Sequence, residues 1–266
     1  MQAPIIKMEH IDKIYHTRTQ DIEALRDISI EIAKEEFVSI IGPSGCGKST
    51  IIRILDDIVQ ATAGSIEVDG YAYEKGVPLP KSVVRKFGFV FQHPNLLPWL
   101  TVRQNMLFPL KVFRDKNPKW KEVVDSLLEM AGMSEYADYY PNALSGGMVQ
   151  RVGVLRAMSY QPPILLMDEP YGALDNMMRE QLDIETMKLV DRLRQTVIFI
   201  THNVEEAVFV ADRVYVMETQ PGRIVDEIAI DLPRPRNLDM TATKQYVEYV
   251  GYLIDKIGSV ELSVVK

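Results

Sequence analysis

The chain has 266 residues, of which 47% are hydrophobic and 25% are charged, and its net charge is −7 at neutral pH. This balance fits a globular protein with a sizeable core, and the acidic excess argues against a nucleic-acid-binding protein that relies on a broadly basic face. The single cysteine, Cys46, excludes an internal disulfide, and no Cys/His cluster of the zinc-binding type occurs. We therefore expect a reducing compartment.

The sequence contains no segment that predicts insertion into a membrane. Residues 1–15 lack the basic and apolar regions of a signal peptide. No apolar run reaches the length of about 18 residues that a membrane-spanning helix needs. If the protein works at a membrane, we expect it to do so through a partner protein.

The first ninety residues predict short strands and one helix. Apolar side chains alternate or cluster over 5–9 and 28–32, and "EEFVSIIG" (35–42) is a β-rich run typical of a buried strand. A helix follows from Lys48, and "SIEVDG" (65–70) predicts a strand that ends in a turn. The predicted apolar face of the helix consists of Ile51, Leu55 and Ile58.

The middle of the chain has helical periodicity. Helices are predicted over 120–131 and 147–158, and we expect a mostly helical insert at about 93–158. The first part of this insert, 93–110, contains Trp99. This tryptophan is either an exposed docking residue or a locally buried one.

Apolar strands alternate with helices in the last part of the chain. Strands are predicted for "PILLMDEP" (163–170), "TVIFITH" (196–202) and "RVYVM" (213–217), with a helix between the first two. Proline disfavours helix at the preceding residue, so "DLPRPR" (231–236) reads as an extended linker. A last helix carries an apolar stripe of Tyr246, Val250, Leu253, Ile254 and Ile257. This alternation indicates an α/β fold with a parallel sheet covered on both faces.

A phosphate-binding loop is predicted at "GPSGCGKST" (42–50), which matches G-x-x-x-x-G-K-[ST] between a predicted strand and a predicted helix. Glycines let backbone N–H groups turn toward phosphate oxygens, and the helix N-terminus adds positive charge. Lys48 would contact the β- and γ-phosphates, and the Ser49 hydroxyl would bind Mg²⁺. A chance Gly/Ser-rich loop is the alternative, which the strand–loop–helix context disfavours. The predicted nucleotide-binding residues are Gly42, Pro43, Ser44, Gly45, Cys46, Gly47, Lys48, Ser49 and Thr50.

Four polar side chains follow other apolar stretches. Asp168 ends a strand at the carboxyl edge of the sheet, where ligands of α/β sheets bind, and it can hold Mg²⁺. The adjacent Glu169 would act as a general base toward an attacking water. His202 ends the next strand, and Gln92 opens the helical insert, where it could sense Mg²⁺ or the attacking water. Each could singly be a solvated or locally hydrogen-bonded group, but together with the phosphate loop they favour phosphate chemistry.

A second glycine-containing stretch, "LSGGMVQR" (144–151), places Ser145 beside Gly146 and Gly147. Such a stretch could be only a turn or a flexible joint. If a helix starts just after the glycines, Ser145 and the two backbone N–H groups are suited to phosphate oxygens.

Taken in order, these motifs resemble the ATP-binding subunit family of ABC transporters over about residues 5–235. The stretch 42–50 is similar to the Walker A motif of the family, "ILLMDEP" (164–170) to Walker B with the catalytic glutamate, and 144–151 to the signature motif. Gln92, "GALD" (172–175) and His202 match the Q-loop, the D-loop and the switch histidine.

Three further comparisons refine this resemblance. Tyr15 is placed like the aromatic residue that stacks on adenine, with plain packing as the alternative. The stretches "LLPWLTVRQNM" (96–106) and "LPRPR" (232–236) are similar to importers of the nitrate, sulfonate and taurine group. The chain departs from the common pattern at Met148, at Val149 and at Asn203, which stands where an aspartate is usual and affects the orientation of His202.

The resemblance implies a P-loop NTPase fold with a RecA-like core and a mostly parallel sheet, an N-terminal antiparallel β subdomain and a helical subdomain insert. It assigns residues 1–92 to the β strands and the P-loop half of the core, and 93–158 to the helical subdomain. Residues 159–235 form the second half of the core, and 236–266 form a C-terminal helical extension.

The resemblance also implies an ATPase that uses ATP and Mg²⁺. The implied catalytic residues are Lys48, Glu169 and His202, and the implied metal-binding residues are Ser49, Gln92 and Asp168. Two such subunits would enclose two ATP molecules, and each ATP would also contact the other chain through Ser145, Gly146, Gly147 and Asp175. The implied partners are a second ATP-binding subunit, a transmembrane permease and, indirectly, a solute-binding protein, with the chain on the cytoplasmic face of the cell membrane.

Three other functions compete with an importer ATPase. A non-transport ABC ATPase usually has tandem nucleotide domains or long coiled coils, which the sequence does not contain. Another P-loop enzyme, such as a kinase, would use Lys48 and Asp168 but leave 144–151 without a role. A non-catalytic binding module would not need Glu169 and His202.

Overall fold

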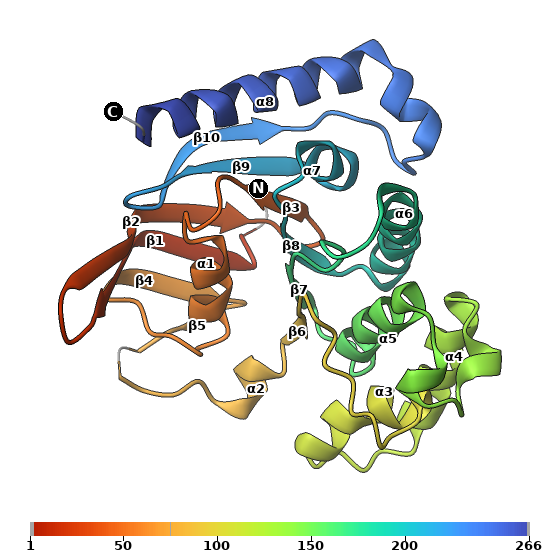
Figure 1. Ribbon diagram of the computed structural model, residues 1–266. Helices are drawn as coiled ribbons and strands as arrows, with labels where there is room; N and C mark the ends of the chain where they lie inside the picture. The colour runs from red at the N-terminus through yellow and green to blue at the C-terminus, as the bar shows by residue number, and fades with distance from the viewer. Residues whose placement is uncertain (1–2, 75, 265–266) are drawn as a thin grey trace. The chain divides into compact units, whose positions relative to one another are not determined.

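The computed structural model describes residues 3–74 and 76–264. The chain divides into two compact units, one formed by Met1–Val84 with Thr196–Lys266 and the other by Arg85–Gln195. We call these the first unit and the second unit. Figure 1 shows the elements of both by label.

An antiparallel sheet opens the first unit. Its strand order is β2-β1-β4-β5, with β1 at Ile6–His16, β2 at Asp21–Ile32, β4 at Ala63–Val68 and β5 at Tyr71–Ala72. The tight turn between β4 and β5 falls on Asp69 and Gly70, whose φ angles of 47° and 78° are those of a two-residue hairpin loop. The predicted antiparallel β subdomain is therefore confirmed.

A second set of strands in this unit has the order β10-β9-β3-β8. The strands are β3 (Phe37–Ile41), β8 (Thr196–Ile200), β9 (Arg213–Glu218) and β10 (Arg223–Ala229). Strand β3 runs parallel to β8 and β9, and β10 is antiparallel to β9. All side chains of β3 and β8 are buried, which is why both read as continuous apolar runs.

Short helices complete this part of the first unit. They are α1 (Lys48–Leu55), α2 (Lys81–Val84) and α7 (Val204–Val210). Ile51 and Leu55 are buried as predicted, but Ile58 is 58% exposed. The prediction for Ile58 was wrong because α1 ends at Leu55 and the backbone of Asp57 turns to φ 55°.

The C-terminal helix α8 (Lys244–Val264) lies along β10, after a short 3₁₀ turn at Leu238–Ala242 (Figure 1). Tyr246, Leu253 and Val260 are buried at a spacing of seven residues. Ile254 is 53% exposed, so its place in the predicted packing stripe was wrong. A helix turns about 100° per residue, and the position after buried Leu253 leaves the packed face.

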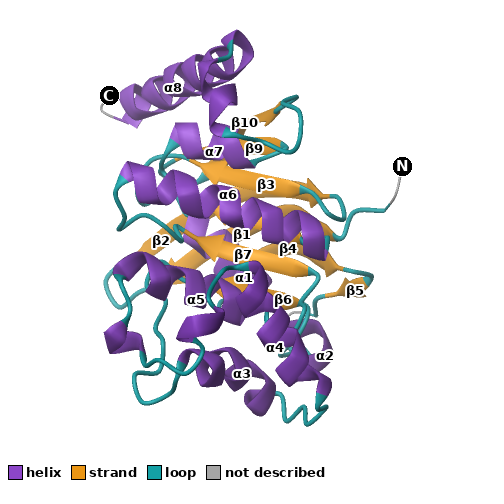
Figure 2. Cartoon of the chain, turned by 90° about the vertical axis from the view of Figure 1, so that its right-hand side faces the viewer, coloured by secondary structure: helices purple, strands orange, loops and turns teal. Residues whose placement is uncertain are grey.

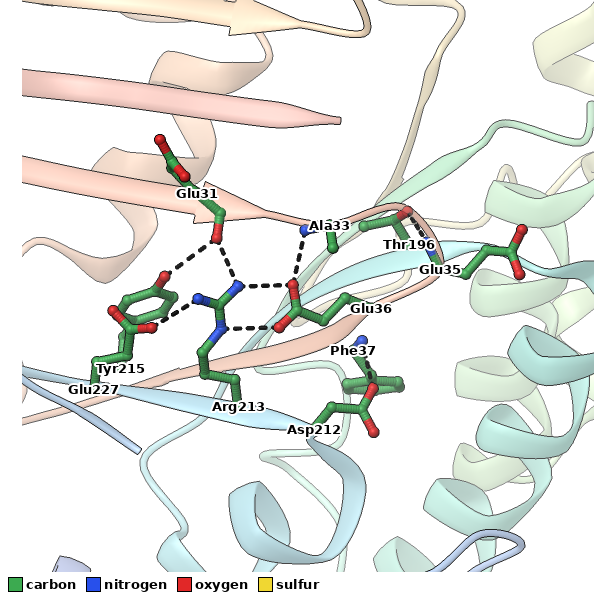
Figure 3. A network of polar contacts seen from close by, with 10 residues as sticks. All are labelled: Glu31, Ala33, Glu35, Glu36, Phe37, Thr196, Asp212, Arg213, Tyr215 and Glu227. Atoms are coloured by element: carbon green, nitrogen blue, oxygen red, sulfur yellow. Dashed lines mark hydrogen bonds and ion pairs between the residues drawn. The ribbon is translucent and has the colours of Figure 1, made fainter. Parts of the chain in front are cut away.

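A polar network holds the start of β9 against the connection between β2 and β3 (Figure 3). The Arg213 guanidinium donates to both carboxylate oxygens of Glu36, at 2.8 and 2.7 Å, and to Glu227 and the Glu31 main-chain oxygen, each at 2.7 Å. The Asp212 carboxylate accepts the N–H of Phe37 at 2.9 Å. Bidentate pairing of this kind fixes geometry as well as charge, so it anchors the entry to β3.

The second unit combines two parallel strands with four helices. The strands are β6 (Phe87–Val90) and β7 (Ile164–Asp168), and the helices are α3 (Val102–Val112), α4 (Lys119–Met130), α5 (Gly146–Met158) and α6 (Asn176–Leu193). Short 3₁₀ turns lie at Ser134–Tyr136 and Pro141–Ala143. Helices α3, α4 and α5 pack together in the lower part of Figure 2. In the described part of the chain, no helix combines the length and apolar character needed to cross a membrane.

Candidate functional site

The loop 42–50 joins buried strand β3 to helix α1 in the first unit. Two of its glycines are at positions where a side chain would clash or would be strained. A Cβ on Gly42 would lie 2.6 Å from the Met217 carbonyl oxygen, and Gly47 has φ 98°, a left-handed conformation. The exposed tip of the loop consists of Ser44 and Gly45. The loop is therefore a tight turn braced by main chain on one side and open at its tip.

Lys48 is buried, and its ammonium group spans the loop. Nζ donates to the carbonyl oxygens of Gly42 at 2.8 Å and Pro43 at 3.0 Å, and lies 3.9 Å from the Cys46 sulfur. Among the described residues, no carboxylate forms an ion pair with this group. A buried cation without a counter-charge is costly unless a ligand supplies one, which fits an anionic ligand such as a phosphate.

Helix α1 also begins without a side-chain cap. Its N-cap residue is Gly47, whereas Ser145, Asp175 and Asn203 cap α5, α6 and α7 with side-chain oxygens. The first N–H groups of a helix have no intrahelical acceptor. At the start of α1 no side-chain cap takes this place, and the helix dipole favours an anion there.

The other loop residues differ in how they could contact a nucleotide. The Cys46 side chain is buried, and burial raises the pKa of its thiol. It could therefore contribute through its backbone but not through its sulfur. Ser49 and Thr50 are half-buried in the first turn of α1, next to Lys48.

His202 lies just beyond β8, the strand that neighbours β3. Ile40 of β3 pairs with Ile200 of β8 in parallel register, so the two strands end side by side. His202 itself is exposed. Asn203 caps α7 by accepting the N–H of Glu206 at 3.1 Å, a bond that an aspartate would also make. The departure at Asn203 therefore keeps the cap that fixes the backbone after His202.

Tyr15 is half-buried near the end of β1. The Lys13 ammonium lies 4.8 Å from the centroid of its ring and also donates to the Gln60 main-chain oxygen at 2.8 Å. A cation over an aromatic face is attractive, so Lys13 holds one face of the ring.

In the second unit, Asp168 is the last residue of β7, as predicted, and Glu169 follows in an unusual conformation. Glu169 has φ 46°, the left-handed region that non-glycine residues seldom adopt. A Cβ on Gly172 would lie 3.4 Å from the Glu169 carboxylate, so this carboxylate points toward the backbone of residue 172. Such strain is typical of functional positions.

Gln92 is exposed just after β6, and its main-chain oxygen accepts a hydrogen bond from the side-chain amide of Gln150 at 3.1 Å. Gln150 is buried on α5, the helix that begins at the signature-like stretch. Sequence reasoning assigned no role to Gln150. The only available signal was its position on one predicted helix, because its partner lies 58 residues earlier in the chain.

The stretch 144–151 forms the start of α5. Ser145 is its N-cap and accepts the N–H of Met148 at 3.4 Å, while Gly146 and Gly147 are the first two helical residues. The helix therefore begins one residue before the predicted range 147–158, and the two glycines belong to its first turn instead of preceding it. Gly146 and Gly147 still carry N–H groups that have no intrahelical acceptor. A Cβ on Gly147 would lie 2.5 Å from the Met178 sulfur, so Met178 of α6 covers this turn.

Asp175 is exposed and caps α6 by accepting the N–H of Met178 at 3.0 Å. One of its carboxylate oxygens is therefore already used in the fold. The other oxygen can serve a further partner. In the first unit the loop 42–50 and His202 thus follow neighbouring strands, and in the second unit the main chain of Gln92 is bonded to α5.

Comparison with known proteins identifies the family. The family described as ABC transporter matches residues 25–172. The chain belongs to the ABC transporter family. The resemblance found in the motifs is confirmed, and so are the fold class and the assignment as an ATP-binding ATPase.

Three ABC proteins illustrate the relationship. The nitrate import ATP-binding protein NrtD of Synechocystis sp. is 38% identical over 257 residues, which cover 96% of this chain and 94% of NrtD. The aliphatic sulfonates import ATP-binding protein SsuB of Bacillus cereus is 33% identical over 97% of this chain and 99% of SsuB. A solved dimeric ATP-binding cassette in a post-hydrolysis state, bound to ADP and Pi, superposes with a TM-score of 0.73 and 32% identity, covering 86% of this chain and 100% of the cassette.

Proposed function

We propose that the chain is the ATP-hydrolysing subunit of an importer for a small solute of the nitrate, sulfonate or taurine type. The observation that supports this most is the similarity to two import ATP-binding proteins along almost the whole of both chains. The chain would work as a dimer on a membrane permease that receives its solute from a solute-binding protein. It would lie on the cytoplasmic face of the cell membrane, attached through the permease.

The phosphate loop would bind the triphosphate of ATP. The buried Lys48 ammonium has no carboxylate partner in the described structure and would be neutralised by the β- and γ-phosphates. The uncapped start of α1 would bind phosphate oxygens through backbone N–H groups. Tyr15 would stack on adenine with the ring face opposite Lys13.

Mg²⁺ would be held by Ser49, Asp168 and Gln92, and when bound it would neutralise charge that develops on the phosphates. Among the described residues, no group of three or more His, Cys, Asp or Glu side chains is arranged to hold a metal. This fits a magnesium ion that takes most of its ligands from phosphate oxygens and water. The metal would therefore bind together with the nucleotide.

Glu169 would accept a proton from the attacking water, and His202 would contact the γ-phosphate. The left-handed backbone at Glu169 sets the direction of its carboxylate, and the cap at Asn203 fixes the chain after His202. A positioned general base contributes typically about 10²–10⁴-fold to the rate.

The second chain of a dimer would complete each site. Ser145, Gly146, Gly147 and Asp175 would contact the ATP held by the partner's phosphate loop. A dimeric ATP-binding cassette with 32% identity supports this arrangement. Opening and closing of the dimer would then be coupled to the permease.

The surface proposed to meet the permease is the segment 93–110. Trp99 is 69% exposed there, which agrees with the docking alternative rather than with local burial. An exposed aromatic residue is a common anchor in protein interfaces.

Reconstitution tests this proposal. The tagged chain is isolated from membranes of its source cells with the proteins bound to it, and these are placed in proteoliposomes with MgATP. We expect uptake of nitrate, taurine or an alkanesulfonate, no uptake of choline, and no uptake with Glu169→Gln. Isolation with ribosomes or DNA instead of a permease would contradict the importer and favour a non-transport ABC ATPase.

A further inference from the structure

The turn between β9 and β10 packs directly against the phosphate loop in the first unit. Within this turn, Gly222 bridges to β2. Its N–H donates to the Ala24 carbonyl oxygen at 3.1 Å, and its own carbonyl accepts the N–H of Arg26 at 2.9 Å. These bonds fix the main chain of Gly222 on both sides.

No side chain fits at this position. A Cβ on Gly222 would overlap the carbonyl oxygen of Cys46 in the phosphate loop, and it would lie 2.8 Å from the Ala24 oxygen and 3.1 Å from the Cys46 carbonyl carbon. The φ angle of Gly222 lies outside the left-handed region that favours glycine. Glycine is therefore required here because there is no room for a Cβ. The atoms that limit the space are main-chain atoms, which cannot rotate away.

The same region encloses the loop from other directions. The Met217 oxygen of β9 would lie 2.6 Å from a Cβ on Gly42, and Leu25 of β2 would lie 2.5 Å from a Cβ on Gly47. The Cys46–Gly47 peptide is thus held between β2 and the β9–β10 turn. This peptide directly precedes Lys48 and the uncapped start of α1.

We propose that Gly222 is a positioning residue for nucleotide binding, because its bare main chain sets the position of the Cys46–Gly47 peptide. This peptide orients the N–H groups that open α1 and the base of the Lys48 side chain. Displacement of reacting groups by about 1 Å can reduce rates 10²-fold. The inference rests on phosphate binding by the loop 42–50, and not on the identity of the solute or the permease.

The substitution Gly222→Ala tests the proposal, with two matched controls. Gly251→Ala adds the same methyl group at a position with no atom within 4 Å of the new Cβ and without a left-handed φ. Ile30→Val removes one methyl group from the buried face of β2 and lowers stability without touching the loop. The measurements are the Kd for a fluorescent ATP analogue, the KM and kcat of ATP hydrolysis, and the thermal midpoint with and without ADP.

We expect Gly222→Ala to raise Kd and KM together by about tenfold or more, with kcat at saturation within about threefold of wild type. The thermal shift caused by ADP should shrink in parallel. Ile30→Val should lower the thermal midpoint but leave Kd and KM unchanged. Gly251→Ala should change none of these three quantities. A purely structural role would make Gly222→Ala resemble Ile30→Val, which would overturn the proposal.

Hydrogen exchange on the wild-type chain tests the proposal even if Gly222→Ala does not fold. We expect ADP to slow exchange at the N–H groups of Gly222 and Arg26 as well as within 42–50. Protection confined to 42–50 would overturn the proposal. If the wild-type chain binds no nucleotide at all, the proposed function fails rather than the role of Gly222.

Discussion

The side-chain amide of Gln150 donates to the main-chain oxygen of Gln92 at 3.1 Å and so ties α5 to the segment after β6. Two more residues on the same face of α5 hold this segment. A Cβ on Gly153 would lie 2.9 Å from Pro94, and Arg156 donates to the main-chain oxygens of Pro94 and, at 3.0 Å, of Asn95. The helix that starts within the stretch 144–151 and the segment 92–95 are therefore parts of one packed body within the second unit.

We predict that Gln150→Ala destabilises the chain by about 1 kcal/mol, the net contribution of a typical hydrogen bond. Gln150→Glu should lower the free energy of unfolding by about 2–3 kcal/mol, because a buried carboxylate would then face a carbonyl oxygen. Urea unfolding measures both, with the exposed Gln181→Ala as the control. If Gln150→Glu were as stable as the wild-type chain, the contact between Gln150 and Gln92 would be contradicted.

Much of the fold could be predicted because buried parallel strands are continuous apolar runs. The strands that end before Gly42, at Asp168 and before Thr201 were all found in this way. Strand β10 was missed, because its side chains alternate between half-buried and exposed positions and include Asp226 and Glu227. Ile58 and Ile254 were misplaced because periodicity does not show where a helix ends or which of two adjacent apolar residues packs.

The candidate site could be predicted only where its chemistry is local in sequence. The loop 42–50 and the stretch 144–151 are short motifs whose residue types follow from phosphate binding. The contacts of Gln150 with Gln92 and of Gly222 with Cys46 join distant segments. The local sequence "QPGR" does not indicate that the Cys46 carbonyl oxygen lies against Gly222.

For the catalytic base, we predict that Glu169→Gln lowers the rate of ATP hydrolysis by about 10²–10⁴-fold while ATP still binds. The amide keeps the size of the side chain but cannot accept the proton. Phosphate release measures the rate, and a fluorescent ATP analogue measures binding. Hydrolysis within a fewfold of the wild-type rate would remove Glu169 from the mechanism.

For the phosphate loop, we predict that Lys48→Ala weakens nucleotide binding by about 10–100-fold, because hydrogen bonds from a charged group contribute about 1.5–3 kcal/mol. The same titration with the ATP analogue measures this loss. Ser49→Ala is the neighbouring control: it should impair magnesium-dependent binding but change binding much less when magnesium is chelated. If Ser49→Ala weakened nucleotide binding equally with magnesium and with magnesium chelated, Lys48 and Ser49 would not have separate roles.

For the shared site, we predict complementation between two inactive chains. Ser145→Arg blocks the stretch 144–151, and Lys48→Ala disables the phosphate loop. A mixed dimer therefore retains one complete site. ATPase activity should be near zero for each variant alone and should return in part on mixing. If each variant alone hydrolyses ATP normally, the stretch 144–151 is only a turn.

Asp56, the residue that follows α1, gives a prediction about pH. Burial, followed by the nearby Asp57 carboxylate, raises the pKa of Asp56 to about 6. Its position at a helix C-terminus, where negative charge is unfavourable, acts in the same direction. In the unfolded chain this carboxyl has a pKa of about 3.9. Between these values the folded state binds the extra proton, so Asp56 lowers the free energy of unfolding as pH rises from about 4 to 6.

We therefore predict that Asp56→Asn stabilises the chain at pH 7 by about 1–2 kcal/mol. The gain should shrink steadily below pH 6 and vanish below about pH 3, where the wild-type carboxyl is protonated in both the folded and the unfolded state. Urea unfolding at several pH values measures the difference between variant and wild type. Asp57→Ala is a comparison: it removes the bond from the Leu79 N–H to Asp57, 2.8 Å long, and should destabilise more at pH 4 than at pH 7, because at pH 7 it also removes a negative charge near the ionised Asp56 carboxylate. A gain for Asp56→Asn that is the same at pH 4 and pH 7 would mean that the ionised carboxylate is not its cause.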